Sequence, residues 1–236
     1  MYRIMKNLCF IIVFSISLNC FAQDFSAYSK ISNQDFKEFT GLFQQKELPL
    51  DSDYLLDNYT FYDMNYQGIP SKFWKFIMKE HQLIPGPLYT IDDEASPNGI
   101  AKIDGCLHPL YKLPTNGDYV ILVFAQTSEI EDYCRVFAYS FDLKGDFINS
   151  ILYLYMPKSQ FIYSSIDKNL YTHQIYPLYD RSDPDKIPGN EVFVAQKAHL
   201  KHEINTKGEV VFKSIDKKEG VEFKYNGKTK LYEIIN

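Results

Sequence analysis

Two stretches of this sequence have the residue types and spacing of a serine nucleophile with a lysine partner. Ser165-x-x-Lys168 and Ser214-x-x-Lys217 match the pattern of penicillin-recognising serine enzymes. That chemistry places the serine and the lysine on one face at the start of a helix. Both copies here end runs that read as β-strands, and no Lys-Thr-Gly sequence follows them. We therefore interpret both as turn chemistry, and no G-x-S-x-G, H-E-x-x-H or P-loop pattern offers another catalytic motif.

The closest pair of histidines is His199 and His202, with Glu203 beside them. On a helix, residues three apart share a face and could bind one metal ion. In a strand they point to opposite faces, and the surrounding sequence reads as extended. We therefore predict no metal site there. The other histidines suggest no site either: His81 follows a predicted helix, and His108 and His173 have no visible partner.

An acidic loop is the one calcium candidate. Asp180, Asp183 and Asp185 lie in a segment with two prolines and one glycine. Calcium takes six to eight oxygen ligands and tolerates irregular loops, but this spacing matches no standard calcium loop. Arg181 and Lys186 offset part of the negative charge. A solvated loop is the alternative interpretation, and the sequence predicts no cofactor.

Two further acidic runs, residues 92–94 and 129–132, read as exposed turns. Carboxylates within one turn cannot lie on either side of a glycosidic bond, as glycoside hydrolysis requires. A hydrolase would have to assemble its acid–base pair from distant loops.

Charge and aromatic content bear on the partner. The 236 residues include 25 basic and 30 acidic side chains, and this acidic balance argues against nucleic acid or anionic lipid as a partner. The chain also has 19 tyrosines and 18 phenylalanines. Aromatic side chains bind sugar rings and form rigid protein contacts, but tyrosine also suits strands that have one wet face.

The first 22 residues have the features of a signal peptide. Arg3 and Lys6 precede an apolar run over residues 8–18, which is too short to span a bilayer comfortably. Cys20-Phe21-Ala22 then resembles a signal-peptidase site, which places the mature start at Gln23. Lipidation at Cys20 is the alternative, although Asn19 fits a lipobox poorly. No second run of membrane length follows, so we expect a soluble exported protein in the periplasm, at the cell surface or outside the cell.

Two cysteines, Cys106 and Cys134, lie beyond this leader. In an oxidising compartment they could form a disulfide that closes a loop of about 28 residues and contributes about 3 kcal/mol. Two buried free thiols are the alternative.

Residues 119–155 read as three consecutive antiparallel strands around which the rest of the chain is organised. Apolar residues occupy both faces of the first strand, and the next two alternate. Asp142-Leu143-Lys144-Gly145 supplies the turn between the second and third, since Asp bonds its own backbone and Gly accepts positive φ. Similar hairpin chemistry recurs at Asn205-Thr206-Lys207-Gly208 and at Asn226-Gly227.

Two short helices are expected before these strands. The first is capped by Ser32 and stops near Gln45, and the second is capped by Ser71 and ends before Pro85-Gly86-Pro87. Further strands are expected at residues 88–92, 99–103, 109–113, 161–166, 170–176, 192–204 and 209–215. The predicted fold is α+β but mainly β: an antiparallel meander or barrel-like sheet with two N-terminal helices. Residues 23–236 form one domain, with a division near residues 85–87 as the alternative.

The order of these features resembles a group of uncharacterised secreted proteins of Bacteroidetes-type bacteria. The resemblance rests on Cys20-Phe21-Ala22-Gln23, on the early helix leading into Leu48-Pro49, on the helix at Ser71 and on residues 139–145. It covers most of the mature chain and implies a cell-envelope or secreted location. It brings no catalytic residues.

Three functions agree with these observations. The first is an exported, non-catalytic binding or interaction module for a glycan or a protein. The second is a secreted hydrolase, for which we expect a cleft with two carboxylates, one of raised pKa. The third is a structural cell-envelope protein, for which we expect a large exposed apolar patch.

Overall fold

A computed structural model describes residues 23–58, 68–77, 90–91, 102–103, 106–128, 133–155, 162–178, 192–226 and 231–235. Several predictions lie outside these residues: the leader and its cleavage site, the division near residues 85–87, His81, the acidic runs at 92–94 and 129–132, and Asp180, Asp183 and Asp185.

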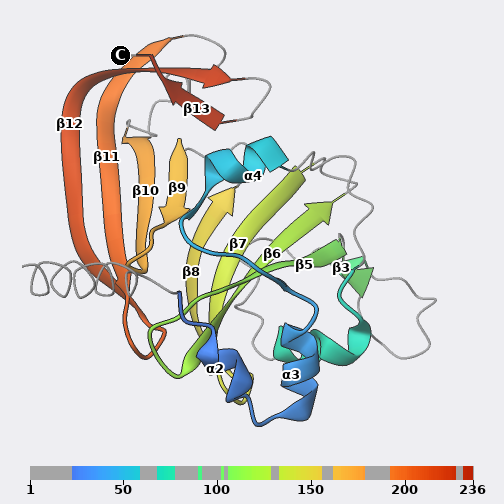
Figure 1. Ribbon diagram of the computed structural model, residues 1–236. Helices are drawn as coiled ribbons and strands as arrows, with labels where there is room; N and C mark the ends of the chain where they lie inside the picture. The colour runs from blue at the N-terminus through green and yellow to red at the C-terminus, as the bar shows by residue number, and fades with distance from the viewer. Residues whose placement is uncertain are drawn as a thin grey trace, which may run out of the picture.

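The fold is mainly β, as predicted, but its strands form two main sheets rather than one (Figure 1). Sheet A has the order β1-β5-β6-β7-β8, and sheet B has the order β13-β12-β11-β10-β9-β2. The strands of sheet A are β1 (Gln44–Gln45), β5 (Cys106–Leu113), β6 (Tyr119–Ser128), β7 (Tyr133–Asp142) and β8 (Phe147–Tyr155). Those of sheet B are β2 (Leu50–Asp51), β9 (Tyr163–Ile166), β10 (Tyr171–Leu178), β11 (Phe193–Ile204), β12 (Val210–Asn226) and β13 (Leu231–Ile234). A small pair joins β3 (Thr90–Ile91) to β4 (Lys102–Ile103).

The predicted meander is confirmed as β6, β7 and β8, which pair in chain order. The turn between β7 and β8 has the expected chemistry: Asp142 Oδ1 accepts the backbone N–H groups of Lys144 and Asp146, at 2.8 and 2.9 Å. Gly145 has a φ of +94°. Most strand pairs are antiparallel, and β1 with β5 is parallel.

The helices differ in detail from the prediction. The N-terminal region contains α2 (Ser26–Ser29), α3 (Gln34–Thr40) and α4 (Ser52–Asn58). Asn33, not Ser32, caps α3, because its side chain accepts the N–H of Phe36 at 3.2 Å. The predicted second helix is the 3₁₀ helix η1 (Ser71–Phe76), whose N-cap is Pro70 rather than Ser71.

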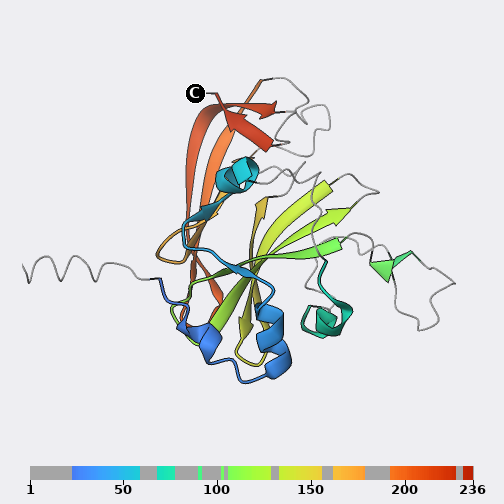
Figure 2. The same ribbon diagram turned by 45° about the vertical axis from the view of Figure 1, so that its right-hand side comes forward.

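Sheet A is the middle layer of three. One of its faces packs on α2, α3 and η1 through a cluster rich in phenylalanine, including Phe36, Phe39, Phe124 and Phe141. Its other face packs on α4 and on the inner face of sheet B, where Ile166 and Ile204 are fully buried. Figures 1 and 2 show sheet B beside sheet A, with its second face turned away from the molecule.

Candidate functional site

The outer face of sheet B, which points away from sheet A, brings three titratable residues together. His173 lies on β10, His199 on β11, and Asp167 in the turn between β9 and β10. Nδ1 of His173 is 3.0 Å from Nε2 of His199, and Nε2 of His173 is 3.1 Å from Oδ2 of Asp167. These residues form one continuous hydrogen-bonded chain, which we call the Asp–His–His chain.

The sheet register creates this arrangement. His173 pairs with Lys201 and Ile175 pairs with His199, so the two histidines are diagonal neighbours on one face of the antiparallel pair. Their rings stack at 30° with centroids 5.2 Å apart. The prediction that His173 has no partner is therefore wrong. Its partners become visible only once β10 and β11 are aligned.

The direction of each of these hydrogen bonds depends on the tautomers of the two rings. An ionised carboxylate only accepts, so the contact with Asp167 requires a proton on Nε2 of His173. If the His173 ring is neutral, its Nδ1 then carries a lone pair and accepts the Nε2–H of His199. This leaves Nδ1 of a neutral His199 as an acceptor at the end of the chain.

The surroundings favour the neutral form of His199. Burial lowers its pKa from the ordinary value of 6.5, and the protonated form of His173 and the positive charges of Lys197 and Lys201 act in the same direction. Asp216, which pairs with His199 across β11 and β12, acts in the opposite direction.

The Ser-x-x-Lys pairs have no catalytic geometry. Ser165 is buried within β9 opposite His173, and Lys168 is exposed in the turn that follows. Ser214 and Lys217 both lie in β12, where residues three apart face opposite sides of the sheet. Neither pair is on a helix, and the prediction that both are turns is wrong for Ser214 and Lys217, which lie within a strand.

His202 lies on the face of β11 opposite to His199, as predicted, and its ring packs against Phe212. In the described part of the chain, no group of three or more histidine, cysteine or acidic side chains could hold a metal ion. His108 is buried in β5.

A second candidate is a cavity of about 310 Å³ between the N-terminal segment and two turns, lined by Gln23, Asp24, Leu48, Pro114, Thr115, Asn116, Lys168 and Leu170. Two of its polar side chains already make hydrogen bonds within the protein. Gln23 bonds both backbone groups of Leu48, at 2.7 and 2.5 Å. Asp24 accepts the N–H and the hydroxyl of Ser26 at the start of α2, and these hydrogen bonds lower its pKa.

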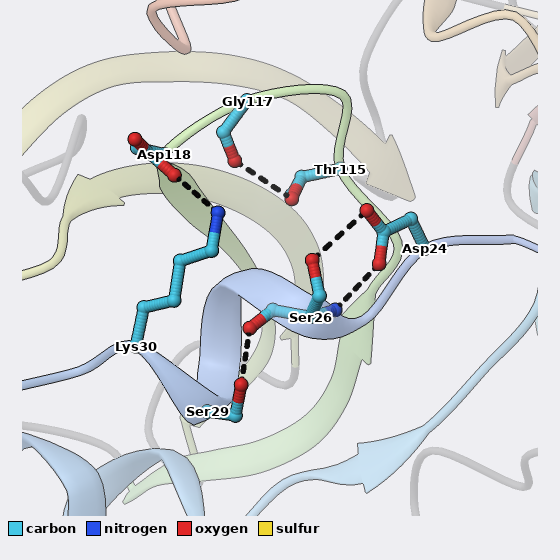
Figure 3. A network of polar contacts seen from close by, with 7 residues as sticks. All are labelled: Asp24, Ser26, Ser29, Lys30, Thr115, Gly117 and Asp118. Carbon is cyan, nitrogen blue, oxygen red and sulfur yellow. Dashed lines mark hydrogen bonds and ion pairs between the residues drawn. The ribbon is translucent and has the colours of Figure 1, made fainter.

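Figure 3 shows that the polar groups beside this cavity connect α2 to the turn between β5 and β6. Nζ of Lys30 lies 2.8 Å from Asp118 Oδ1, and both side chains are largely exposed. Ser29 Oγ donates to the carbonyl of Ser26 at 2.7 Å, and Thr115 Oγ1 donates to that of Gly117 at 3.4 Å. This network positions a helix and a turn, and it leaves few polar groups to recognise a ligand.

The features expected of a hydrolase do not appear in the described residues. The carboxyl groups whose pKa is shifted there are Asp24, Asp35 and Glu38, and all three are shifted downward. Hydrogen bonds from Lys75 and Lys72 lower the pKa of Asp35 and of Glu38.

The register places strand β6 between the two cysteines. Cys106 on β5 and Cys134 on β7 pair with the same residue, Thr127, from opposite sides. Two strand spacings amount to about 9.5 Å, whereas the Cα atoms of a disulfide lie about 4.4–6.8 Å apart. Of the two alternatives that the sequence left open, this register favours separate thiols over a disulfide.

The tyrosines whose side chains the structure describes are either buried or half-buried. Tyr28, Tyr111, Tyr119, Tyr139 and Tyr232 are buried, and Phe212 is the one aromatic residue among the large apolar side chains exposed in the described part of the chain. The structural interpretation of the tyrosine content therefore fits these residues better than a sugar-binding surface does.

Within the described ranges, no helix has both the length and the apolar character to cross a membrane. No protein-family model, curated protein or solved structure matches the chain.

Proposed function

We propose that this protein is an exported, non-catalytic interaction module that binds an extended segment of a partner protein along the edge of β12. The leader at residues 1–22 supports export, and the edge of β12 supports this mode of binding. Addition of a strand to a sheet edge is a recurrent way for a protein to bind an extended peptide.

The observation that carries the proposal is the unequal length of the outer strands of sheet B. β12 has 17 residues, but β13 pairs only with its last part, from Phe223 to Asn226. In the ranges that the structure describes, residues 211–220 lie beside β11, which pairs with all of them except Lys213, Glu219 and Gly220, and no strand pairs with their other side. Their outward backbone groups can hydrogen-bond to a further strand.

Irregular pairing limits the most regular part of this edge to five residues. The register between β11 and β12 shifts between Lys201 and His202 and again between Ala195 and Lys197. Residues 214–218 lie between these two shifts. Bulges of this kind blunt an edge against indiscriminate pairing, so they favour a short and selective contact.

The side chains along the edge define the chemistry of the partner. Val211, Phe212 and Ile215 are exposed by 40, 56 and 39%. Lys213, Lys217 and Lys218 outnumber Asp216 and Glu219 in the same stretch, although the whole chain is acidic. The edge therefore suits a strand that alternates apolar and acidic residues, and its lysines disfavour pairing with a second copy of itself.

A protein partner agrees with this surface better than a glycan does. Sugar binding uses exposed aromatic faces, whereas the described tyrosines are buried or half-buried. A strand partner uses backbone hydrogen bonds and small apolar contacts, and β12 offers both.

The test uses a synthetic peptide of about ten residues that alternates valine and glutamate, a typical strand length. We expect binding by calorimetry and slower hydrogen exchange of amides in residues 214–218. The control peptide has the same sequence, but the backbone nitrogens whose N–H groups would face β12 are methylated. Equal binding of the methylated peptide, or no binding of the parent peptide, would contradict the proposal.

Two proline variants provide a matched control within the chain. In an antiparallel ladder, adjacent residues direct their N–H groups to opposite sides, so one of Asp216 and Lys217 points to β11 and the other outward. Proline is tolerated on an edge where the N–H faces solvent. We expect one of D216P and K217P to keep the parent melting temperature and lose the peptide. If the stable variant still binds, β12 is not the binding edge.

A further inference from the structure

We propose that the Asp–His–His chain regulates the edge of β12: when His199 gains a proton, this edge binds an acidic strand more tightly. The inference rests on the proposed function, because it concerns the same edge and the same kind of partner. It adds a condition to that function, namely that binding is tighter in mildly acidic than in neutral solution.

His199 lies one strand away from the edge of β12, since β11 is the neighbour of β12 in sheet B (Figure 1). It pairs directly with Asp216, so the two side chains are neighbours on the outer face of the sheet. Asp216 is exposed and is the acidic residue of the regular part of the edge, residues 214–218. A change of charge on His199 therefore acts on the side chain that an incoming strand meets.

The two faces of β12 determine how an alternating strand lies along it. Phe212 and Ile215 pair with alternate residues of β11, on the face opposite to His199. The apolar residues of the partner fit on that face, beside Phe212 and Ile215. Its acidic residues then lie on the other face, where Asp216 and His199 are.

The Asp–His–His chain can take up one proton without losing a hydrogen bond. When Asp167 accepts the Nε2–H of His173 and Nδ1 of that ring accepts the Nε2–H of His199, the chain does not use the lone pair on Nδ1 of His199. A proton added there creates a positive ring beside Asp216 and preserves both contacts. A proton added to Nδ1 of His173 would instead set two N–H groups against each other at 3.0 Å. The first proton therefore belongs to His199.

The charged groups around His199 set how readily it gains this proton. Burial lowers its pKa below the ordinary value of 6.5, and a protonated His173 acts in the same direction. So do Lys197 and Lys201, whereas Asp216 opposes them. Other titratable residues lie on or beside the same face: Asp167, Tyr171, Glu203, Lys213 and Lys218. An acidic partner adds negative charge to this face, so its binding favours the protonated form of His199.

The direction of the pH effect follows from these positions. While His199 is neutral, Asp216 repels an acidic residue on the partner. Once His199 is protonated, it balances that negative charge, and the lysines of the edge dominate. The change in cross-strand interaction corresponds to an affinity that is about two- to fivefold higher. Because glutamate keeps its charge down to about pH 5, the affinity should increase as the pH falls from about 6.5 to about 5.

The experiment measures binding of the valine–glutamate peptide by calorimetry at about pH 7.5 and about pH 5.5. We expect the affinity of the parent protein to be about two- to fivefold higher at the lower pH. A peptide that alternates valine and glutamine should show no such increase. H199Q should lose the increase, and H202Q, which removes a histidine on the opposite face of β11, should retain it.

A variant of Asp167 tests the direction of the hydrogen-bonded chain. D167N keeps an oxygen for the backbone N–H groups of the turn but presents an amide N–H to His173. The His173 ring must then accept at Nε2 and donate from Nδ1, which occupies the lone pair on Nε2 of His199. A neutral His199 has no second lone pair to protonate, so the increase in affinity should shrink in D167N.

NMR titration of the histidine rings supplies a readout that needs no variant. The valine–glutamate peptide should raise the titration midpoint of His199, because binding and protonation favour each other. Melting curves at both pH values identify variants that fail to fold. Equal affinity of the parent at both pH values, or an increase that folded H199Q retains, would overturn this inference while the proposed function stands. No binding at either pH would overturn both.

Discussion

The two carboxylate oxygens of Asp167 have different partners, and one of them bonds the ring of His173. Oδ2 lies 3.1 Å from Nε2 of His173, while Oδ1 accepts the backbone N–H groups of Asn169 and Tyr171. The turn between β9 and β10 and the Asp–His–His chain therefore share one residue. A change at Asp167 acts on both, and the two effects can be separated by the choice of substitution.

Replacement of Asp167 by alanine removes both acceptors of the turn, whereas asparagine retains one oxygen. We expect D167A to lower the free energy of unfolding by about 1–3 kcal/mol, the range for leaving hydrogen-bonding groups unpaired, and D167N to lower it clearly less. Urea denaturation of both variants measures this. Equal losses would show that Oδ1 contributes little to the turn.

Leu170 occupies the position that glycine occupies in two other turns of this protein. Asp142, Asn205 and Asp167 each accept the N–H groups two and four residues later. The residue three positions later is Gly145, Gly208 or Leu170, with φ of 94°, 80° and 60°. Leucine in this region is strained by about 1–2 kcal/mol, but its side chain is buried in the core between the sheets.

This strain predicts an inverted order of two variants. L170A loses the core side chain and retains the strain, whereas L170G loses the side chain and relieves it. We expect both to be less stable than the parent, with L170G more stable than L170A by about 1 kcal/mol, although glycine normally ranks below alanine. Chemical denaturation decides the order. A more stable L170A would mean that residue 170 does not have positive φ.

Gly145 is constrained by space as well as by φ. A Cβ atom there would lie 2.8 Å from the ring of Phe36 and 2.9 Å from that of Phe76. We expect G145A to lower the free energy of unfolding by about 2–4 kcal/mol, from backbone strain and overpacking together. Gly220 is the matched control, because its φ is +66° and no atom lies within 4 Å of the added Cβ. If G220A is as harmful as G145A, the contact with Phe36 does not matter.

Local patterns predicted the elements better than their assembly. The meander followed from alternating apolar residues and from the Asp142–Gly145 turn, which are local signals. The pairing of His173 with His199 depends on the register between two strands, and residues 26 apart give no local sign of it. The strain at Leu170 was hidden for a different reason, since leucine is not a turn residue and its burial outweighs its backbone preference.

The same limit explains the predictions that were wrong. Ser32 and Asn33 are both good N-caps, and only the backbone geometry shows that Asn33 bonds the helix. The strands divide into two sheets because β9 pairs with β10 and β2 and not with β8. The sequence between β8 and β9 does not indicate this choice of partner. The pairing of the cysteines is a different case, because the sequence left it open and the register places β6 between them.

The cysteine register gives a direct chemical prediction. We expect the folded protein to contain Cys106 and Cys134 as free thiols after purification without reductant. Alkylation under denaturing conditions, followed by mass spectrometry of the peptides, counts them. A peptide pair linked through the two cysteines would show that the ends of β5 and β7 depart from this register.

The histidines on β11 predict how stability changes with pH. Burial is the main cause that lowers the pKa of both His199 and His202 below the ordinary value of 6.5. The unfolded chain therefore binds more protons than the folded chain between the two pKa values. The free energy of unfolding should decrease as the pH falls through about 6.5 and should level off below the folded pKa.

Variants separate this effect from that of the carboxylates. Asp24, Asp35 and Glu38 have lowered pKa values, so their stabilisation is lost only at more acidic pH, as they titrate below their ordinary values. Urea denaturation between about pH 7 and pH 5 isolates the histidines. We expect the slope of stability against pH to be smaller in H199Q and in H202Q, and smallest in the double variant. A double variant with the parent slope would assign the pH dependence to other groups.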